Sequence, residues 1–245
     1  MKHYAPAPRK RLRLSPLLFR RIHKWVGLIL GLQFVLWTLS GSVMALLDKD
    51  AVGGHGGAGA ASQPLSWPSA TAPLPVTGPV QGLTARTIAG EPVIEVLQDG
   101  ETRLFTPSTG EPVRIDPKLA EKIARYAYHH EAAVRDITLL EKPNLEAREH
   151  SGAMYRVDFA DDQNSTAYVS AIDGRALENR SDTWRLWDFA WMLHNMDYMN
   201  RASFNHPLII FVAFGTLWLS LTGFYLLFKS FKRREFNWLI GRPRG

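Results

Sequence analysis

The sequence predicts an α+β membrane protein in which two antiparallel transmembrane helices flank a folded extracytoplasmic segment. Residues 25–47 carry no charged side chain. At 1.5 Å per residue their helix is about 34 Å long, which is enough to cross a hydrocarbon core of roughly 30 Å. Residues 206–228 form a second stretch of the same kind. Because backbone amides inside lipid are satisfied within one segment only by a helix, both stretches are expected to be transmembrane helices.

The distribution of charge predicts the topology. Residues 1–24 carry eight Lys or Arg and no acid, and residues 229–245 carry six against one Glu, whereas the segment between the spans is net acidic. By the positive-inside rule both basic tails, 1–24 and 229–245, are cytoplasmic, and residues 48–205 lie on the opposite side of the membrane. The overall charge of +6 is therefore a topology signal and gives no reason to expect nucleic-acid binding.

The segment between the spans predicts a linker followed by a duplicated fold. Residues 48–82 are rich in Gly and then in Pro, which is typical of a linker. Residues 83–180 contain two repeats, about 83–115 and 117–180, and each shows strand, turn, strand, tight turn and short strand. The tight turns fall at Gly110 and Gly174, and the first hairpin turns at Asp99-Gly100. A helix is expected over 117–130, with Asp116 as its N-cap.

Residues 181–200 predict an interfacial helix with one aromatic face. At 100° per residue the aromatic residues and one histidine fall on a single stripe, which comprises Trp184, Trp187, Trp191, His194 and Tyr198. Trp and Tyr favour the membrane–water interface, so the simplest interpretation is an amphipathic helix lying there. His194 stands apart, because it lies just before the second span.

Histidines and glycines recur at matched places in the two spans. Each span begins with a histidine, His23 or His206, and later carries a hydroxyl residue followed by Gly41 or Gly223. Antiparallel spans put His23 level with Gly223 and His206 level with Gly41. Glycine leaves room for a flat cofactor, and histidine is the usual axial ligand of haem iron. The plainer alternative is that these histidines are interfacial polar residues and that the glycines serve helix packing.

His194 and His206 are the best candidate pair of haem ligands in the sequence. The chain has no cysteine, so a haem would be a non-covalent b-type haem. His23 has no evident partner, and we consider two explanations: a second protomer, paired through Gly27 and Gly31, or a role only as an anchor. His129 and His130 are a weaker candidate metal site, with a surface role as the alternative.

Two stretches carry a family resemblance. The repeat that reads YRVDF…STAYVSAIDGRAL resembles a PepSY domain, and the segments RRIHKWVGLILGLQFVLWTLSG and WMLHNMDY are similar to the PepSY-associated transmembrane family. Larger members of that family, with about four spans, resemble iron-uptake proteins of the bacterial inner membrane. Those proteins are proposed to reduce ferric siderophores with haem held by membrane histidines. The resemblance implies that this chain lies in the inner membrane, with residues 48–205 in the periplasm.

Two functions follow as hypotheses. The first is a haem-binding protein, either an electron-transfer subunit or a ferric-chelate reductase, that assists reduction of ferric iron or a ferric siderophore. The tails are too short to hold a flavin or nicotinamide domain, so the donor would be a quinol or a separate cytoplasmic reductase. The second is a non-enzymatic, membrane-anchored PepSY module that binds or regulates a periplasmic partner. We find no hydrolase or P-loop motif in the sequence.

Overall fold

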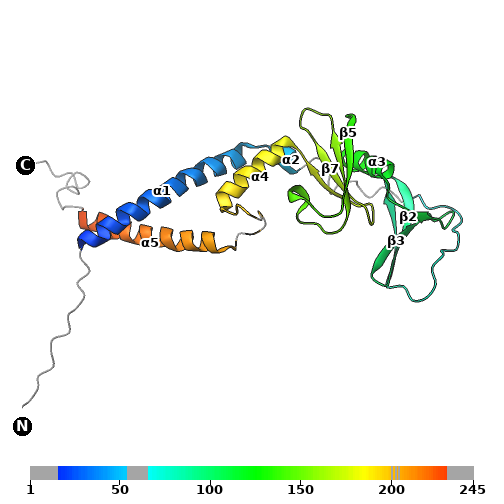
Figure 1. Cartoon of the computed structure of the whole chain (residues 1–245), viewed down its shortest axis with the longest axis horizontal. Helices are drawn as coiled ribbons and strands as arrows, with labels where there is room; N and C mark the ends of the chain where they lie inside the picture. The colour runs from blue at the N-terminus through cyan, green and yellow to red at the C-terminus, as the bar shows by residue number, and fades with distance from the viewer. Residues whose placement is uncertain (1–15, 54–65, 200, 202, 204, 231–245) are drawn as a thin grey trace, which may run out of the picture. The chain divides into compact units, whose positions relative to one another are not determined.

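The computed structural model describes residues 16–53, 66–199, 201, 203 and 205–230 (Figure 1). These residues divide into two compact units. The helical unit is drawn from residues 1–41 and 192–245, and the sheet unit comprises residues 42–191. Most of the two predicted basic tails, and residues 54–65 of the predicted linker, lie outside the described residues.

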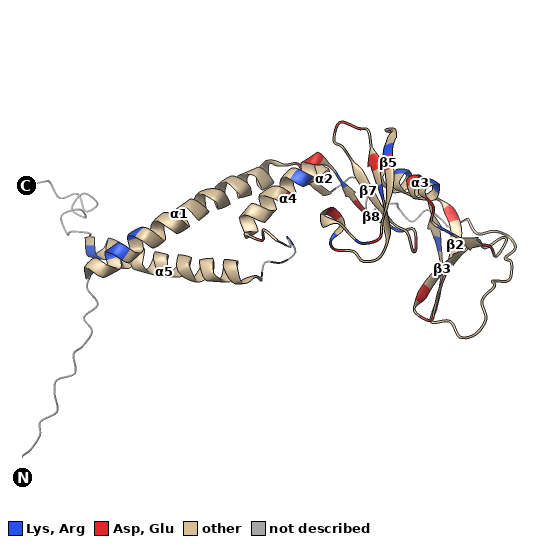
Figure 2. Cartoon of the chain, viewed as in Figure 1, with Lys and Arg blue, Asp and Glu red and all other residues tan. Residues whose placement is uncertain are grey.

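The helical unit is built on two long apolar helices, α1 (Pro16–Leu46) and α5 (Pro207–Ser230). Both are long and apolar enough to cross a membrane, with mean hydropathies of 1.7 and 1.9. Only 11% and 6% of their most apolar windows are buried, so their side chains face outward, as they do in lipid and not in a soluble core. Lys and Arg gather at one end of this helix pair (Figure 2). The predicted pair of spans is confirmed.

Helix α1 begins nine residues before the predicted span. Its first turns include Arg20, Arg21 and Lys24, which have good helix propensity and place their charged ends beyond the apolar region. The predicted span began at residue 25 because the last charged side chain before it is Lys24. The helix begins earlier because charged residues are compatible with helical backbone outside the apolar region.

Small residues let α1 and α5 approach one another. A Cβ built on Gly27 would lie 3.6 Å from Leu219, and one built on Gly215 would lie 3.4 Å from Leu30. Gly27 thus faces α5 of the same chain, while Gly31 has no atom within 4 Å of that position. A homodimer through Gly27 and Gly31 remains a prediction, and Gly31 is the more available of the two.

The sheet unit contains two four-stranded antiparallel meanders, which match the predicted pair of sheet units. In each sheet every strand pairs with the next along the chain. The first has β1 (Gly82–Ile88), β2 (Glu91–Gln98), β3 (Glu101–Phe105) and β4 (Pro112–Val113). The second has β5 (Val134–Leu140), β6 (Met154–Phe159), β7 (Thr166–Ser170) and β8 (Ala176–Arg180). The edge strands β1 and β5 are additional to the strands expected from sequence.

The predicted turns require their glycines. Asp99 and Gly100 both have positive φ, 52° and 78°, as a type I′ hairpin turn demands. Gly174 has φ of 68°, and a Cβ there would lie 2.8 Å from Cδ1 of Ile115. The turn of the second repeat therefore packs directly on the end of the first.

A single helix serves both sheets. Helix α3 (Pro117–Tyr128) begins at Asp116, whose carboxylate accepts a 2.7 Å hydrogen bond from the amide of Leu119. Its apolar face shares one core with both sheets, so the two predicted units pack on a common helix. That core includes Ile88, Val93, Leu104, Ile115, Ala120, Ile123, Ala124, Tyr128, Val157, Phe159, Ala167 and Val169.

The aromatic stripe of the predicted 181–200 helix is only partly exposed. Helix α4 (Asp182–Asn195) buries Trp184, which is 7% exposed and lies under the Arg180 guanidinium at 4.0 Å from the ring centroid. The exposed large apolar residues of α4 are Leu186 and Phe189. Trp184 is a packing residue of the sheet unit, and short elements α2 (Lys49–Gly53) and η1 (Leu145–Ala147) complete that unit.

An ionic network fixes α4 to the second sheet within the sheet unit. Arg185 donates to Glu146 at 2.7 Å, and the Tyr168 hydroxyl donates to the same carboxylate at 2.8 Å. Burial alone would raise the pKa of Glu146, but the hydrogen bonds from Arg185 and Tyr168 outweigh it and lower that pKa. Burial raises the pKa of Tyr168 to about 12, so its hydroxyl stays a donor at neutral pH.

Glu146→Gln is expected to lower the free energy of unfolding by about 1–2 kcal/mol near neutral pH. Because folding lowers the pKa of Glu146, its stabilisation is complete above the ordinary value of 4.5 and is lost as the pH falls through the lowered value. Urea titrations of the full chain in detergent, followed by the far-ultraviolet β-sheet signal, measure the difference between wild type and variant. A difference that stays the same from neutral to strongly acidic pH contradicts this account.

Candidate functional site

The first candidate site lies at the basic end of the helix pair. Nδ1 of His23, on α1, is 2.8 Å from the Thr222 hydroxyl on α5. That hydroxyl lies 2.8 Å from the backbone carbonyl of Trp218, to which it donates. The Trp218 ring centroid lies 6.4 Å from that of His23. Two residues one turn apart on the opposite helix, Trp218 and Thr222, therefore position the imidazole.

The second candidate site repeats this arrangement at the other end of α1. Nδ1 of His194, in the last turn of α4, is 3.2 Å from the hydroxyl of Ser40. The Ser40 hydroxyl donates to the Leu36 carbonyl at 2.6 Å, and Ser40 is only 3% exposed. Trp37 donates its indole N–H to the backbone carbonyl of His194 at 2.6 Å. A hydroxyl and a tryptophan thus position this imidazole too.

Both imidazoles meet a hydroxyl whose hydrogen is already directed elsewhere. A hydroxyl has one hydrogen, and in Thr222 and Ser40 it is donated to a helix carbonyl. The hydroxyl oxygen is therefore placed to accept from Nδ1–H of the histidine, and in a neutral imidazole that tautomer carries its lone pair on Nε2. Among the residues that the structure describes, Nε2 of neither His23 nor His194 has a hydrogen-bond partner. A neutral imidazole held through Nδ1 with Nε2 free is the form in which histidine ligates a metal.

The glycines after the hydroxyl residues make room for these rings. A Cβ built on Gly223 would lie 3.5 Å from Cε1 of His23, and one built on Gly41 would lie 3.3 Å from Cε1 of His194. As expected from antiparallel spans, His23 lies against Gly223. The ring over Gly41 is that of His194, and the imidazoles themselves fill the space that we had assigned to a flat cofactor.

His206 has a different place. Its Nε2 is 2.7 Å from the carbonyl of Asn195, and its Nδ1 accepts from the amide of Ile209 at 3.4 Å. Both ring nitrogens are therefore engaged by the backbone, and the ring closes the first turn of α5. In this conformation His206 offers no free nitrogen, so the predicted pairing of His194 with His206 on one iron has no support from the geometry. Substitution of His206 tests this predicted pairing.

The two histidine sites are far apart. Ser40, the partner of His194, follows His23 by 17 residues in one continuous helix. At 1.5 Å per residue this separation is about 25 Å along α1. His23 and His194 therefore belong to two sites near opposite ends of the apolar span, and each contributes one imidazole.

Two histidines of the sheet unit, His129 and His130, cap a helix and pack against neighbouring side chains. His129 is the left-handed C-cap of α3, with φ of 54°. His130 contacts Asn179 through Nε2 at 3.0 Å and stacks on Phe159, with ring centroids 4.1 Å apart. Within the described residues no group of three or more His, Cys, Asp or Glu is placed to hold a metal ion. The proposal of a metal at His129 and His130 gains nothing from the geometry.

A polar cavity of about 400 Å³ opens beside His130. It is lined by Tyr128, Asp161, Ser165 and Asn179, among others. The Tyr128 hydroxyl is buried with no hydrogen-bond partner among the described residues, and burial raises its pKa. Burial alone would also raise the pKa of Asp161, but hydrogen bonds from Ser165 outweigh it and lower that pKa. The cavity thus has one carboxylate in its lining and, buried in its wall, a hydroxyl without a partner among the described residues.

The sequence pointed to the histidines and glycines but not to their supporting residues. Ser40 and Thr222 were noted only as neighbours of glycine, although they fix Nδ1 of the two imidazoles. The shared signal is Trp, then two or three residues, then a hydroxyl and Gly: Trp37 to Gly41 and Trp218 to Gly223. Helical spacing places the tryptophan one turn before the hydroxyl, on the same face.

These features define a two-span membrane protein with an imidazole held at each end of its helix pair and a duplicated sheet unit between the spans. Residues 20–245 match the family described as PepSY-associated TM region, and the chain belongs to that family. No curated protein and no solved structure matches the chain.

Proposed function

We propose that this chain is a haem-binding electron-transfer protein of the bacterial inner membrane that assists reduction of ferric iron or a ferric siderophore in the periplasm. The observation that carries the proposal is the matched pair of imidazoles, His23 and His194, each held through Nδ1 by a hydroxyl and each without a hydrogen-bond partner at Nε2 among the described residues. Histidines with no role beyond anchoring would not need the same surroundings twice, with a hydroxyl beside Nδ1 and a glycine beside Cε1.

The donor set fits one axial ligand of a b-type haem at each end. The hydroxyl beside Nδ1 would fix the orientation of each ring, as outer partners of ligating histidines do. Bound haem would supply one-electron chemistry. Each iron would take its second ligand from a second protomer or another protein, because His206 is engaged by the backbone.

The remaining roles fall to the two ends of the helix pair. By the charge rule, the end that carries Arg20, Arg21 and Lys24 faces the cytoplasm and holds His23. A quinol or a separate cytoplasmic reductase would donate electrons there. His194 would hold the haem at the periplasmic end, on the side of the membrane where the ferric acceptor would be reduced.

The electron-transfer step is tested with the purified, haem-loaded protein. The haem is reduced anaerobically with a quinol, and ferric citrate is then added while the absorbance of the reduced haem is followed. We expect reoxidation of the haem with formation of ferrous iron, and loss of that reaction in His194→Ala. A reduced spectrum that persists after addition of ferric citrate contradicts the proposal.

A second candidate function is a membrane-anchored module that binds a periplasmic ligand or partner without redox chemistry. The polar cavity with the unpartnered Tyr128 hydroxyl favours it, because a buried donor that finds no partner in the protein is suited to an acceptor on a ligand. This function predicts that Tyr128→Phe impairs function in cells while His23 and His194 tolerate substitution.

A further inference from the structure

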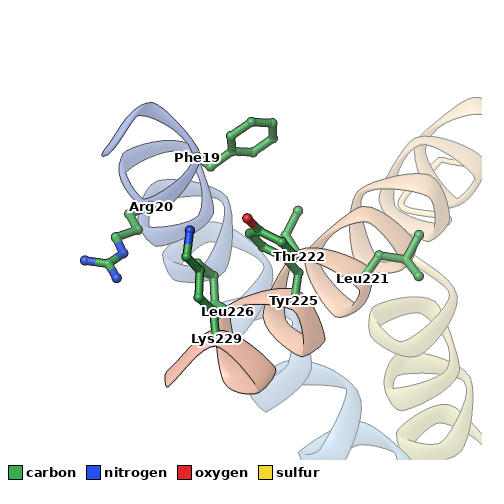
Figure 3. Close-up of a pocket in the computed structure, with 7 residues that line it drawn as sticks. All are labelled: Phe19, Arg20, Leu221, Thr222, Tyr225, Leu226 and Lys229. Atoms are coloured by element: carbon green, nitrogen blue, oxygen red, sulfur yellow. The ribbon is translucent and has the colours of Figure 1, made fainter. Parts of the chain in front are cut away.

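A separate cavity of about 310 Å³ lies between the first turns of α1 and the last turns of α5 (Figure 3). Its walls are mainly apolar and come from Phe19 on α1 and from Leu221 and Leu226 on α5. Two cationic side chains, Arg20 and Lys229, also line it. The combination of apolar walls and cations at the end of a helix pair is what an amphiphile with an anionic head requires.

The cations of this cavity have no acid to neutralise them within the described residues of the helical unit. Described residues 16–30 and 215–230 contain no Asp or Glu, and the described acid of the helical unit, Asp197, lies in the segment after α4. The Lys229 ammonium instead lies 5.8 Å from the ring centroid of Tyr225. Among the described residues, the Lys229 ammonium thus has an aromatic face and apolar walls beside it and no carboxylate, a setting that favours pairing with an external anion.

The surroundings decide which anion fits. Both helices belong to spans, so the cavity lies where the apolar region meets the lipid headgroups. A soluble phosphate would gain nothing from Phe19, Leu221 and Leu226, whereas a phospholipid would place its phosphate at the cations and an acyl chain along the leucines. Basic pockets between transmembrane helices bind anionic headgroups in this way.

We infer that this cavity binds the headgroup of an anionic phospholipid, with Lys229 and Arg20 as the groups that recognise its charge. Thr222 also lines the cavity, and the same residue accepts from Nδ1 of His23. A bound lipid would therefore touch the residue that orients the first imidazole. The inference does not depend on haem, because none of the lining residues is a proposed ligand.

Native mass spectrometry of the full chain in a neutral detergent tests the inference. The protein is titrated with phosphatidylglycerol, which is anionic, and with phosphatidylcholine, which is zwitterionic. We expect the anionic lipid to bind more tightly, and Arg20→Gln/Lys229→Gln to weaken its binding about tenfold or more. The matched control is Arg21→Gln/Lys24→Gln, which removes the same charge from the same end of the helix pair at residues that do not line the cavity.

Three results would overturn the inference. Equal binding of the two lipids would show that headgroup charge is not recognised, and equal loss in the control would show only a general surface potential. Displacement of the lipid by free glycerol phosphate at matched concentration would identify a soluble anion site. Lys229→Arg keeps the charge and is expected to keep binding, which separates recognition from misfolding. His23→Ala is expected to retain phosphatidylglycerol, so failure of the haem proposal leaves this test intact.

Discussion

Replacement of His23 or His194 by alanine is expected to remove haem from the purified protein, one site for each substitution. In each case the change deletes the imidazole whose Nδ1 is held by Thr222 or Ser40 and whose Nε2 is free. Loss of the supporting hydroxyl is a milder change. Ser40→Ala is expected to weaken haem affinity about ten- to hundredfold, as the loss of an outer partner of a ligating histidine does. Haem content per chain and the absorption spectrum of each variant measure these effects.

The control for this prediction is His206→Asn. Asparagine is a good N-cap and can still close the first turn of α5, so the helix is expected to survive. Because both nitrogens of His206 contact the backbone, this variant is expected to retain haem. If His206→Asn loses haem while His23→Ala retains it, the pairing of His194 with His206 is correct and the assignment of two separate sites is wrong.

The second large effect is expected at Gly41. A leucine there would start from a Cβ only 3.3 Å from Cε1 of His194, and the rest of the side chain would occupy the position of the imidazole. Gly41→Leu is therefore expected to remove haem from the His194 site as completely as His194→Ala does. A leucine has better helix propensity than glycine, so a loss cannot be attributed to a weaker helix.

Gly31→Leu is the matched control for Gly41→Leu. Gly31 lies in the same helix, and no atom lies within 4 Å of a Cβ built there. This variant is expected to keep haem at both sites, because Gly31 contacts neither His23 nor His194. Size-exclusion chromatography with light scattering is run on the same samples. If Gly31→Leu loses both the haem and the dimer, Gly31 pairs the protomers and the second ligand comes from the partner.

The sequence predicted those features that follow from simple periodicities. Two apolar stretches of spanning length predict two antiparallel helices, and antiparallel order alone brings His23 to Gly223. The hairpin at Asp99-Gly100 and the N-cap at Asp116 were predictable because local geometry decides them. Each of these features depends on residues close in sequence or on the antiparallel order of two consecutive spans.

The features that were missed depend on tertiary context. Strand β1 alternates poorly, because Arg86 pairs with Glu95 on one face, and β5 carries Arg135 and Asp136. Both are edge strands, whose exposed positions need not be apolar. The role of His206 depends on the path of the chain between α4 and α5, which returns the ring to the Asn195 carbonyl. No pattern in the sequence fixes that path.

The most direct test of the account is a reduced-minus-oxidised absorption spectrum of the detergent-purified protein, expressed with ample haem and combined with haem quantification per chain. The two imidazole sites predict a b-type spectrum, with about one haem per chain if two protomers share each iron and about two per chain if another protein supplies the second ligand. A flat spectrum from folded protein would contradict the haem proposal and leave the membrane-anchored binding module as the function.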